Sequence, residues 1–526
     1  MFGESGRNLH PAIAAAAIAG FFFLFGLITL DDFGVTWDEP LHFAAGDLYL
    51  DRILDPGKAV SISDQDFEED IRYYGPLFDI WGALNHRLLT LRLGLLEEDS
   101  ARHLHLLLAG GLTIFFTILL AAQVFSHRIG IFSGLFLAVF PRFVGHSFNN
   151  PKDIPLALVF VLCLFFFYRR LITGKRSYSL LLLLAGGVGF ATRIQYLLAP
   201  LLIIILTIVY NSIIRPPGKS FRSKMGACWD IPLALLLTIF LGMIFWPYFW
   251  TSPLEKFQAM IDFYLRHPIQ AQLIIRYLGR DHIPGVTLPW HYVPVMLTVT
   301  SPLYTLGMIL IGIGTMFRCL IRKKSGEKEK FGAILVLLWI IIGLLPFMLP
   351  GQRVYGGIRH FLFTVPALCV AAGVGLEYLL TRTRVRYRYP VRIAVSLLFI
   401  LVFISTYSYH PYYTIYYNSL VGGPRGAFGR FSVENWGNAY KAACRWLNRH
   451  APEGSTVLAL VAEQIPRWHL RPDITVLGSE AAADPASRYD YSIYILRDID
   501  PLLKQDMEPI FQISVKGQPI CNVHQW

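Results

Sequence analysis

The sequence predicts a polytopic α-helical membrane protein with about eleven transmembrane helices and a small extracytoplasmic α/β domain at its C-terminus. Three observations predict this fold class. Of the 526 residues, 54% are hydrophobic and 16% are charged, and the mean hydropathy of +0.47 is well above that of a soluble domain. Several apolar runs reach the roughly 20 residues that a helix needs to cross a bilayer. About 115 residues of ordinary soluble composition follow the last run.

The apolar runs place the predicted spans. They cover residues 11–30, 103–125, 130–145, 154–168, 178–193, 195–213, 229–247, 291–317, 331–349, 361–380 and 393–409. The first run is long and has no small-residue cleavage pattern before the acidic stretch that follows it. We therefore interpret it as a retained anchor and not as a signal peptide.

Lysine and arginine collect in every second loop between these spans, for example in YRRLITGKR, RPPGKSFRSK, RCLIRKKSGEKEK and TRTRVRYRYPVR. Basic residues are retained on the cytoplasmic side, so we expect a multi-pass protein of the cell membrane with a cytoplasmic N-terminus and an external C-terminus. We therefore attribute the formal net charge of +11 to the basic residues of the cytoplasmic loops. No basic stripe is interleaved with exposed aromatic residues, and we expect membrane lipids but no nucleic acid as partners.

The predicted external loops carry the unusual residues. The first external loop, 31–102, has sixteen acidic and six basic residues, and its segment 77–96 is predicted to be an amphipathic helix that lies in the membrane interface. Shorter external segments are PRFVGHSFNNPKDIP, at 141–155, and PGQRVYGGIRH, at 350–360. A longer one, 248–290, is rich in aromatic residues, histidine and proline.

We predict two domains, a transmembrane module at 1–409 and a soluble domain at 410–526. In the second domain the pattern favours a helix near 438–449 and short strands at STVLALVA, YDYSIYIL, PIFQISV and PICNVH.

Cys444 and Cys521 could form a disulfide if this domain is external. Without C-x-x-C pairs the six cysteines indicate neither a metal ribbon nor a redox motif.

The stretch DDFGVTWDEPLHF, which begins at Asp31, follows the first span at once. Proline is favourable at the first helical position, so Pro40 predicts a helix start with Glu39 at its cap and Asp38 just before it. The positive end of the helix dipole should keep both carboxylates ionised. Three roles stay open for such carboxylates: a general base, a metal ligand or a helix cap.

Further polar side chains gather at span ends on the same external side. NNPKDIP places Lys152 and Asp153 at the mouth of a span, and His146 and Asn149 lie close by in the sequence. The re-entry GGIRHF and the span end ATRIQY add a further set: Arg359, His360 and Arg193. Snorkelling at the interface accounts for any one of these cations. It accounts less well for their convergence, because external loops are poor in positive charge.

An acidic loop facing several external cations fits an anionic lipid substrate, best of all a polyprenyl phosphate that carries a sugar. Lysine and arginine would bind the phosphate through charge-assisted hydrogen bonds. Carboxylates, amides and aromatic faces would bind the sugar. Transfer of the sugar needs one base for the acceptor proton, whereas glycoside hydrolysis uses two carboxyl groups.

Several motifs together resemble the bacterial and archaeal relatives of the protein O-mannosyltransferases, which are GT-C type glycosyltransferases that use polyprenyl-phosphate-linked sugars. The motifs are WDEPLHFAAGDLY, PRFVGHSFNNPKDIP, GGIRHFLFTVPAL, YYTIYYNSLVGGPRGAF and NWGNAY. The resemblance covers the spans and the start of the C-terminal domain. The β-trefoil domain of the eukaryotic mannosyltransferases has no counterpart in the C-terminal part of the sequence, which counts against a protein acceptor. Fold and donor class do not determine acceptor chemistry, so glycan, lipid and protein all stay open.

The resemblance implies an inverting enzyme whose active site lies on the external face. It places the acidic pair of the family on Asp38 and Glu39, with Asp38 as the catalytic base. Asp153 is expected near the donor phosphate or the acceptor. The resemblance places donor-phosphate binding on Arg359 and His360, and further donor contacts are expected from Lys152, Arg193, His146 and Asn149.

We expect no metal or other cofactor. Asp38 and His42 are spaced to share a helix face, but two ligands do not make a zinc site. The alternative function is a multi-span transporter or lipid flippase, and a non-catalytic scaffold is a third class. Transporters commonly place ionisable groups near the midplane of repeated halves, whereas the charges here lie at span ends and no repeat is evident.

Overall fold

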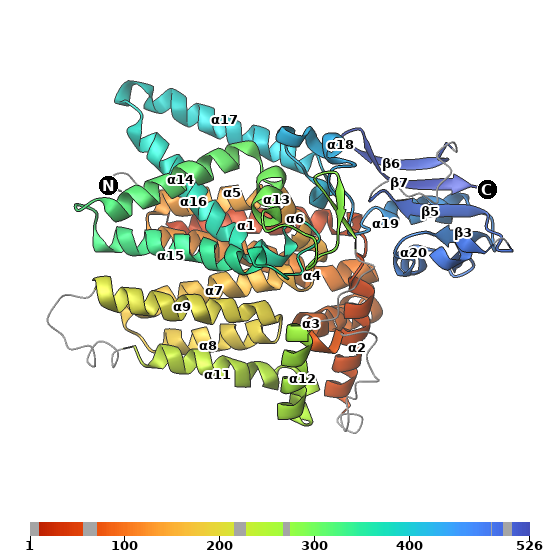
Figure 1. The fold of residues 1–526 in the computed structure, drawn as a ribbon, viewed down its shortest axis with the longest axis horizontal. Helices are drawn as coiled ribbons and strands as arrows, with labels where there is room; N and C mark the ends of the chain where they lie inside the picture. Colours follow the sequence, from red (N-terminus) through yellow and green to blue (C-terminus); the bar gives the residue numbers. More distant parts are fainter. Residues whose placement is uncertain (1–9, 56–70, 215–227, 267–273, 485, 498–507) are drawn as a thin grey trace.

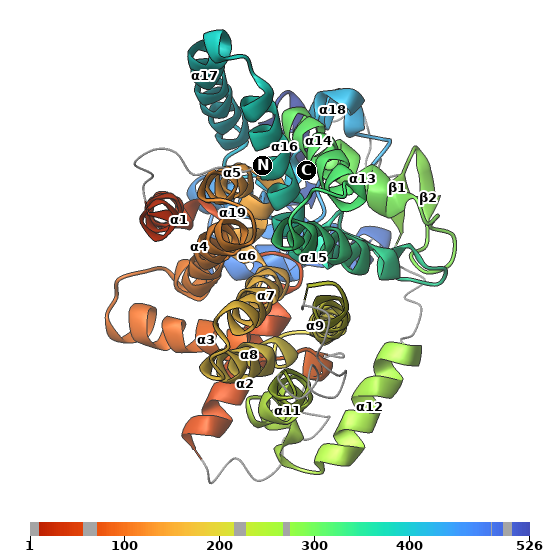
Figure 2. The same ribbon diagram turned by 90° about the vertical axis from the view of Figure 1, so that its left-hand side faces the viewer.

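A computed structural model describes residues 10–55, 71–214, 228–266, 274–484, 486–497 and 508–526. Its long helices lie side by side, and the C-terminal sheet lies beyond one end of them (Figure 1). Figure 2 looks along the helices and shows them packed as a bundle around α4, α7 and α16. The apolar helices are α1 (Pro11–Ile28), α4 (Glu98–Val124), α5 (His127–Ala138), α7 (Asp153–Thr173), α8 (Ser177–Phe190), α9 (Leu198–Val209), α11 (Asp230–Ile244), α14 (Leu303–Ile321), α15 (Glu327–Leu344), α16 (Val365–Arg382) and α17 (Arg388–Tyr407).

The predicted spans correspond to helices of the described residues. Eight are long and apolar enough to cross a membrane, one further span is a bent pair, and α8 and α11 are shorter apolar helices. The span predicted at 130–145 is broken: α5 ends at Ala138, and α6 (Pro141–Asn149) leaves it at 66°. Pro141 starts α6 because proline has no N–H to continue the hydrogen bonding of α5 and suits a first helical turn.

The span predicted at 291–317 is likewise two helices, α13 (Tyr292–Thr300) and α14. Ser301 has extended backbone and Pro302 caps α14, so the chain turns between them. This is the expected effect of a proline on the residue before it.

Two amphipathic helices cross the end of the bundle that carries the sheet (Figure 1). They are α2 (Glu39–Leu54) and α3 (Leu77–Asn85), and a π-helical turn, His86–Arg92, continues α3. The predicted amphipathic helix at 77–96 is therefore confirmed as helical, with exposed leucines along it at Leu84, Leu88 and Leu91. Gly46 lets α2 and α3 touch, because a Cβ there would overlap the Asp79 carbonyl.

The long external loop predicted at 248–290 contains α12 (Pro253–Arg266) and the hairpin of β1 (Ile275–Tyr277) and β2 (Arg280–His282). In Figure 1, α12 lies at the same end of the bundle as α2 and α3. Its Tyr264 hydroxyl donates to the Tyr73 carbonyl at 2.8 Å, which ties this loop to the first external loop.

The C-terminal part forms the predicted α/β structure. The sheet order is β4-β3-β5-β7-β6, with β3 parallel to β4 and β5, and with β7 antiparallel to β5 and β6. The elements are α19 (Tyr440–His450), β3 (Thr456–Ala459), α20 (Gln464–His469), β4 (Thr475–Leu477), β5 (Tyr491–Ile495), β6 (Phe511–Val515) and β7 (Gln518–Gln525). The four predicted strands are present, and β4 was not predicted because it is only three residues long.

Two further expectations concern this part of the chain. Cys444 and Cys521 are both buried and free, so the structure contains no disulfide between them. The domain boundary at 409/410 stays a prediction. Asn418 lies beyond it, yet its amide Nδ2 donates to the Thr298 carbonyl at 2.6 Å and so packs against α13.

Charged side chains dock the C-terminal part onto the bundle. Lys441 Nζ on α19 lies 2.7 Å from Asp99 Oδ2 at the start of α4 and 3.1 Å from Asp31 Oδ1. Arg445 Nη2, one turn further on, lies 2.7 Å from Asp31 Oδ2. The pair of Lys441 and Asp99 is buried, whereas the side chains of Arg445 and Asp31 are 43% and 55% exposed.

We expect Lys441→Met to destabilise the protein by about 3–5 kcal/mol, because it leaves the buried Asp99 carboxylate without its cation. Arg445→Met is the matched control, and it should cost less than about 1 kcal/mol because that pair faces water. Thermal unfolding of the purified protein in detergent measures both variants. Equal melting temperatures for the two would contradict the unequal roles of the two ion pairs.

Candidate active site

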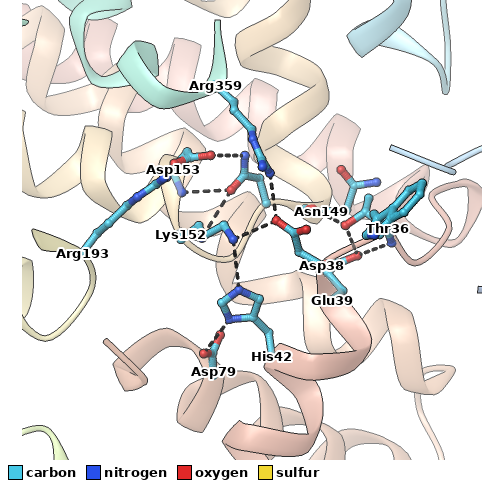
Figure 3. Close-up of polar contacts among 12 residues, drawn as sticks. Thr36, Asp38, Glu39, His42, Asp79, Asn149, Lys152, Asp153, Arg193 and Arg359 are labelled. Atoms are coloured by element: carbon cyan, nitrogen blue, oxygen red, sulfur yellow. Dashed lines mark hydrogen bonds and ion pairs between the residues drawn. The ribbon is translucent and has the colours of Figure 1, made fainter. Parts of the chain in front are cut away.

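Asp38 lies at the centre of a polar cluster at the sheet end of the bundle (Figure 3). Its Oδ2 accepts hydrogen bonds from Lys152 Nζ and from Arg359 Nη1, both at 2.8 Å. The chain enters α2 one residue earlier than expected, so Asp38 is the cap residue and Glu39 is the first helical residue. The Asp38 side chain caps no backbone N–H, so the helix-cap interpretation of this carboxylate is wrong.

The two cations determine the charge of this carboxylate. Burial raises the pKa of Asp38, but the charges of Lys152 and Arg359 outweigh burial and hold that pKa well below the usual range. Burial also lowers the pKa of Lys152, which the charge of Asp38 opposes. Asp38 is therefore an ionised group with a quarter of its side chain exposed.

Arg359 is held between one aromatic ring from its own loop and one from the C-terminal part of the chain. It begins the short helix η9 (Arg359–Thr364), and its guanidinium carbon lies 4.5 Å from the ring centre of Tyr355 and 4.7 Å from that of Trp436. Such cation–π contacts fix the plane of the guanidinium. Residue-by-residue analysis of the sequence missed both rings. The motif NWGNAY, which contains Trp436, contributed only to the family resemblance.

Lys152 is fixed by a second group of side chains. Its Nζ lies 3.3 Å from His42 Nε2 and 4.9 Å from the ring centre of Tyr74. The other ring nitrogen of His42, Nδ1, lies 2.8 Å from Asp79 Oδ2. His42 thus contacts a lysine and an aspartate. Within the described residues, no group of three or more His, Cys, Asp and Glu side chains is placed to hold a metal ion.

Asp153 lies beside this cluster and is paired with Arg193, as Figure 3 shows. Its Oδ2 accepts a hydrogen bond from Asn150 Nδ2 at 2.9 Å, and its backbone N–H donates to Asn150 Oδ1 at 2.9 Å. His146 Nδ1 lies 3.1 Å from Asn150 Nδ2. Asn150 Oδ1 also accepts from the Lys152 backbone N–H at 3.3 Å, so Asn150, which the sequence analysis did not select, joins the predicted site residues Asp153, His146 and Lys152.

Glu39 and Asn149 lie on the other side of the segment that leads into α2. Glu39 is fully buried, its Oε2 accepts from Thr36 N at 2.7 Å, and its Oε1 lies 2.9 Å from His103 Nε2. Asn149 Nδ2 donates to the Gly34 carbonyl at 3.2 Å. Both side chains therefore stabilise the backbone of segment 34–38 through hydrogen bonds. In Figure 3 they point away from Lys152.

Several buried nitrogen atoms around Asp38 have no hydrogen-bond partner among the described residues. They are Arg359 Nε, Arg193 Nε, His360 Nε2 and His146 Nε2. His360 stacks edge-on against Tyr355, with ring centres 4.6 Å apart. Buried polar groups are normally paired, so unpaired guanidinium N–H groups beside a third cation mark a place for an anionic ligand.

Comparison with known protein families finds a match to the dolichyl-phosphate-mannose-protein mannosyltransferases, over residues 89–246. The resemblance to protein O-mannosyltransferases indicated by the motifs is confirmed over that part of the chain. Comparison with curated proteins finds no significant match.

Solved structures with a similar fold include ArnT and AglB. ArnT from Cupriavidus metallidurans, bound to undecaprenyl phosphate, has a TM-score of 0.54 and 14% identity, with 97% of each chain covered. The archaeal oligosaccharyltransferase AglB from Archaeoglobus fulgidus, in complex with an inhibitory peptide and a dolichol-phosphate, has a TM-score of 0.50 and 13% identity, with 92% of this chain and 69% of that chain covered. The likeness confirms the predicted fold class, a polytopic helical membrane protein of GT-C type. With the family match, it supports a membrane glycosyltransferase.

The buried pair of Glu39 and His103 generates a prediction. Glu39→Leu should destabilise the protein by about 3–5 kcal/mol, because it removes one partner of a fully buried pair and the acceptor of the Thr36 N–H. Glu39→Gln retains an acceptor of the same shape and should cost much less. Melting temperatures in detergent test both variants, and a wild-type value for Glu39→Leu would contradict the supporting role of Glu39.

Proposed function

We propose that this protein transfers a sugar from a polyprenyl-phosphate-linked donor to an acceptor hydroxyl at the external face of the cell membrane, with inversion at the sugar carbon. The observation that carries the proposal is the position of Asp38. An ionised carboxylate with partial exposure lies between two buried cations, Lys152 and Arg359, at the sheet end of the bundle. In this proposal a base and a phosphate site therefore share one cluster of side chains.

The donor phosphate is proposed to bind Lys152, Arg359 and Arg193. Unpaired N–H groups on both arginines support this, because phosphate oxygens would accept from them. Each of the two neighbours with a similar fold was solved with a polyprenyl phosphate. We place His360 and His146 at the edge of this phosphate site and Asp153 behind it, where it orients Arg193.

The proposed step exchanges one bond at the anomeric carbon and transfers one proton. The acceptor oxygen attacks the anomeric carbon of the donor sugar, and the bond from that carbon to the phosphate oxygen breaks. The phosphate oxygen leaves with the electron pair as polyprenyl phosphate, stabilised by the cations, while Asp38 takes the acceptor proton. Attack from the face opposite the leaving group inverts the configuration of the sugar.

The two roles of the cations are coupled in this proposal. Lys152 and Arg359 hold the pKa of Asp38 low, which makes it a weak base. A bound phosphate would share these cations, and the pKa of Asp38 would rise. The positive charge at the phosphate comes from side chains here, and no metal ion is part of the proposal.

Asp38→Asn should abolish transfer, because the amide cannot take the acceptor proton, a loss of about 10²–10⁴-fold. The same variant should bind undecaprenyl phosphate at least as tightly as the wild type, since the phosphate no longer competes with a carboxylate for Lys152 and Arg359. The assay is release of free polyprenyl phosphate from a panel of polyprenyl-phosphate sugars by equal amounts of each protein. Equal release by both proteins would exclude Asp38 as the base, and no release by the wild type across a broad panel would favour a transporter.

The pH dependence provides a separate test. The base must be ionised, so activity is present above its pKa and is lost as the pH falls through it. The acid limb of the kcat/KM profile reports the free enzyme, and its midpoint should lie below the usual pKa of an aspartate. The acid limb of the kcat profile reports the donor-bound enzyme, and its midpoint should lie at higher pH. Coincident limbs would show that donor binding does not change the environment of Asp38.

A further inference from the structure

His42 and Asp79 form a buried dyad directly behind Lys152. His42 lies one helical turn after Asp38 on α2, so the same helix face presents both side chains to the lysine (Figure 3). The exposed fractions of His42 and Asp79 are 2% and 7%. The close contact of α2 with α3 at Gly46 brings Asp79 within reach of the imidazole.

The partners of His42 determine which ring nitrogen carries the proton. The ammonium group of Lys152 has three donors and no lone pair, so His42 Nε2, at 3.3 Å, must be the acceptor of that contact. The proton of the neutral ring then lies on Nδ1, where it is donated to Asp79 Oδ2 at 2.8 Å. A carboxylate behind a histidine fixes its tautomer in the same way in hydrolase triads and metal sites.

This arrangement holds the lysine ammonium on three sides. Asp38 accepts from it, His42 accepts from it, and the face of Tyr74 lies against it. A free lysine side chain would lose rotamer entropy when a ligand orders it, and this loss would weaken binding. Asp38 is also the group that would give up its contact with Lys152 when phosphate arrives. His42 is then the hydrogen-bond partner that keeps the ammonium in place.

We infer that His42 and Asp79 are positioning residues that hold Lys152 in place for the donor phosphate. The inference rests on the proposed function, because it assigns the dyad to the phosphate site of that reaction. The competing explanation is that the pair only joins α2 to α3. The two explanations differ for substitutions that keep the packing but change the hydrogen bonding.

Three variants separate these explanations. His42→Phe fills the space but offers Lys152 no acceptor, whereas His42→Gln offers a carbonyl oxygen. Asp79→Asn is isosteric, but its amide can donate to Nδ1, which would move the ring proton to Nε2 and point it at the ammonium. A purely structural dyad would tolerate Asp79→Asn better than His42→Gln, and a positioning dyad would show the opposite order.

The measurements are the dissociation constant for undecaprenyl phosphate, the KM for a transferable donor, and the melting temperature. His42→Phe and Asp79→Asn should each weaken the binding of undecaprenyl phosphate by about 10- to 100-fold, the usual effect of losing a supporting partner. His42→Gln should stay close to the wild type. The control is His105→Phe, a buried histidine on α4 whose ring stacks on Phe78 and Trp81 of α3 without contacting Lys152, and it should not change the affinity.

A double variant tests whether His42 acts through Lys152. If it does, His42→Phe in a Lys152→Met background should weaken binding no further than Lys152→Met alone. Additive losses, or equal losses in the His105→Phe control, would overturn the inference. A wild-type protein that neither binds undecaprenyl phosphate nor releases it from a donor would instead overturn the proposed function. Normal wild-type binding with an unchanged His42→Phe variant would overturn the inference alone.

Discussion

The site depends on the shared carboxylate of Asp38, which accepts hydrogen bonds from Lys152 and Arg359. Buried charges are costly unless they are paired, so this interaction ties together three segments that are far apart in the sequence. These are the start of α2, the residue before α7, and the start of η9. Because the pairing occurs at the sheet end of the bundle, the ends of the helices determine the shape of the site.

The C-terminal part supports this interaction directly. Its Trp436 covers one face of the Arg359 guanidinium, and its Asn438 Oδ1 accepts from the Gly34 N–H at 2.7 Å. The segment that carries Asp38 is therefore enclosed between the bundle and the C-terminal part. A domain that resembles an appendage in the sequence is, in the structure, one wall of the candidate active site.

Broken helices position the remaining polar groups. The bend before Pro141 turns α6 by 66° from α5, and α6 then presents His146 to Asn150 and Asn149 to the Gly34 carbonyl. An unbroken span would have carried these residues further along the axis of α5. Proline thus contributes to the site through its effect on the backbone, since it removes a hydrogen-bond donor where the chain must change direction.

The sequence by itself determined the helical membrane fold, the places of the spans, and the set of charged residues at one end of them. Hydropathy and loop charge are local properties, and they act in the same way whatever the chain packs against. Only the tertiary structure decided what each charged residue contacts. Asp38 and Glu39 are adjacent and chemically alike, yet Asp38 faces two cations and Glu39 faces His103. A change of one residue directs a side chain about 100° around a helix, and the partners come from segments tens to hundreds of residues away. That is why Trp436 and the link from His42 to Asp79 could not be predicted from local patterns.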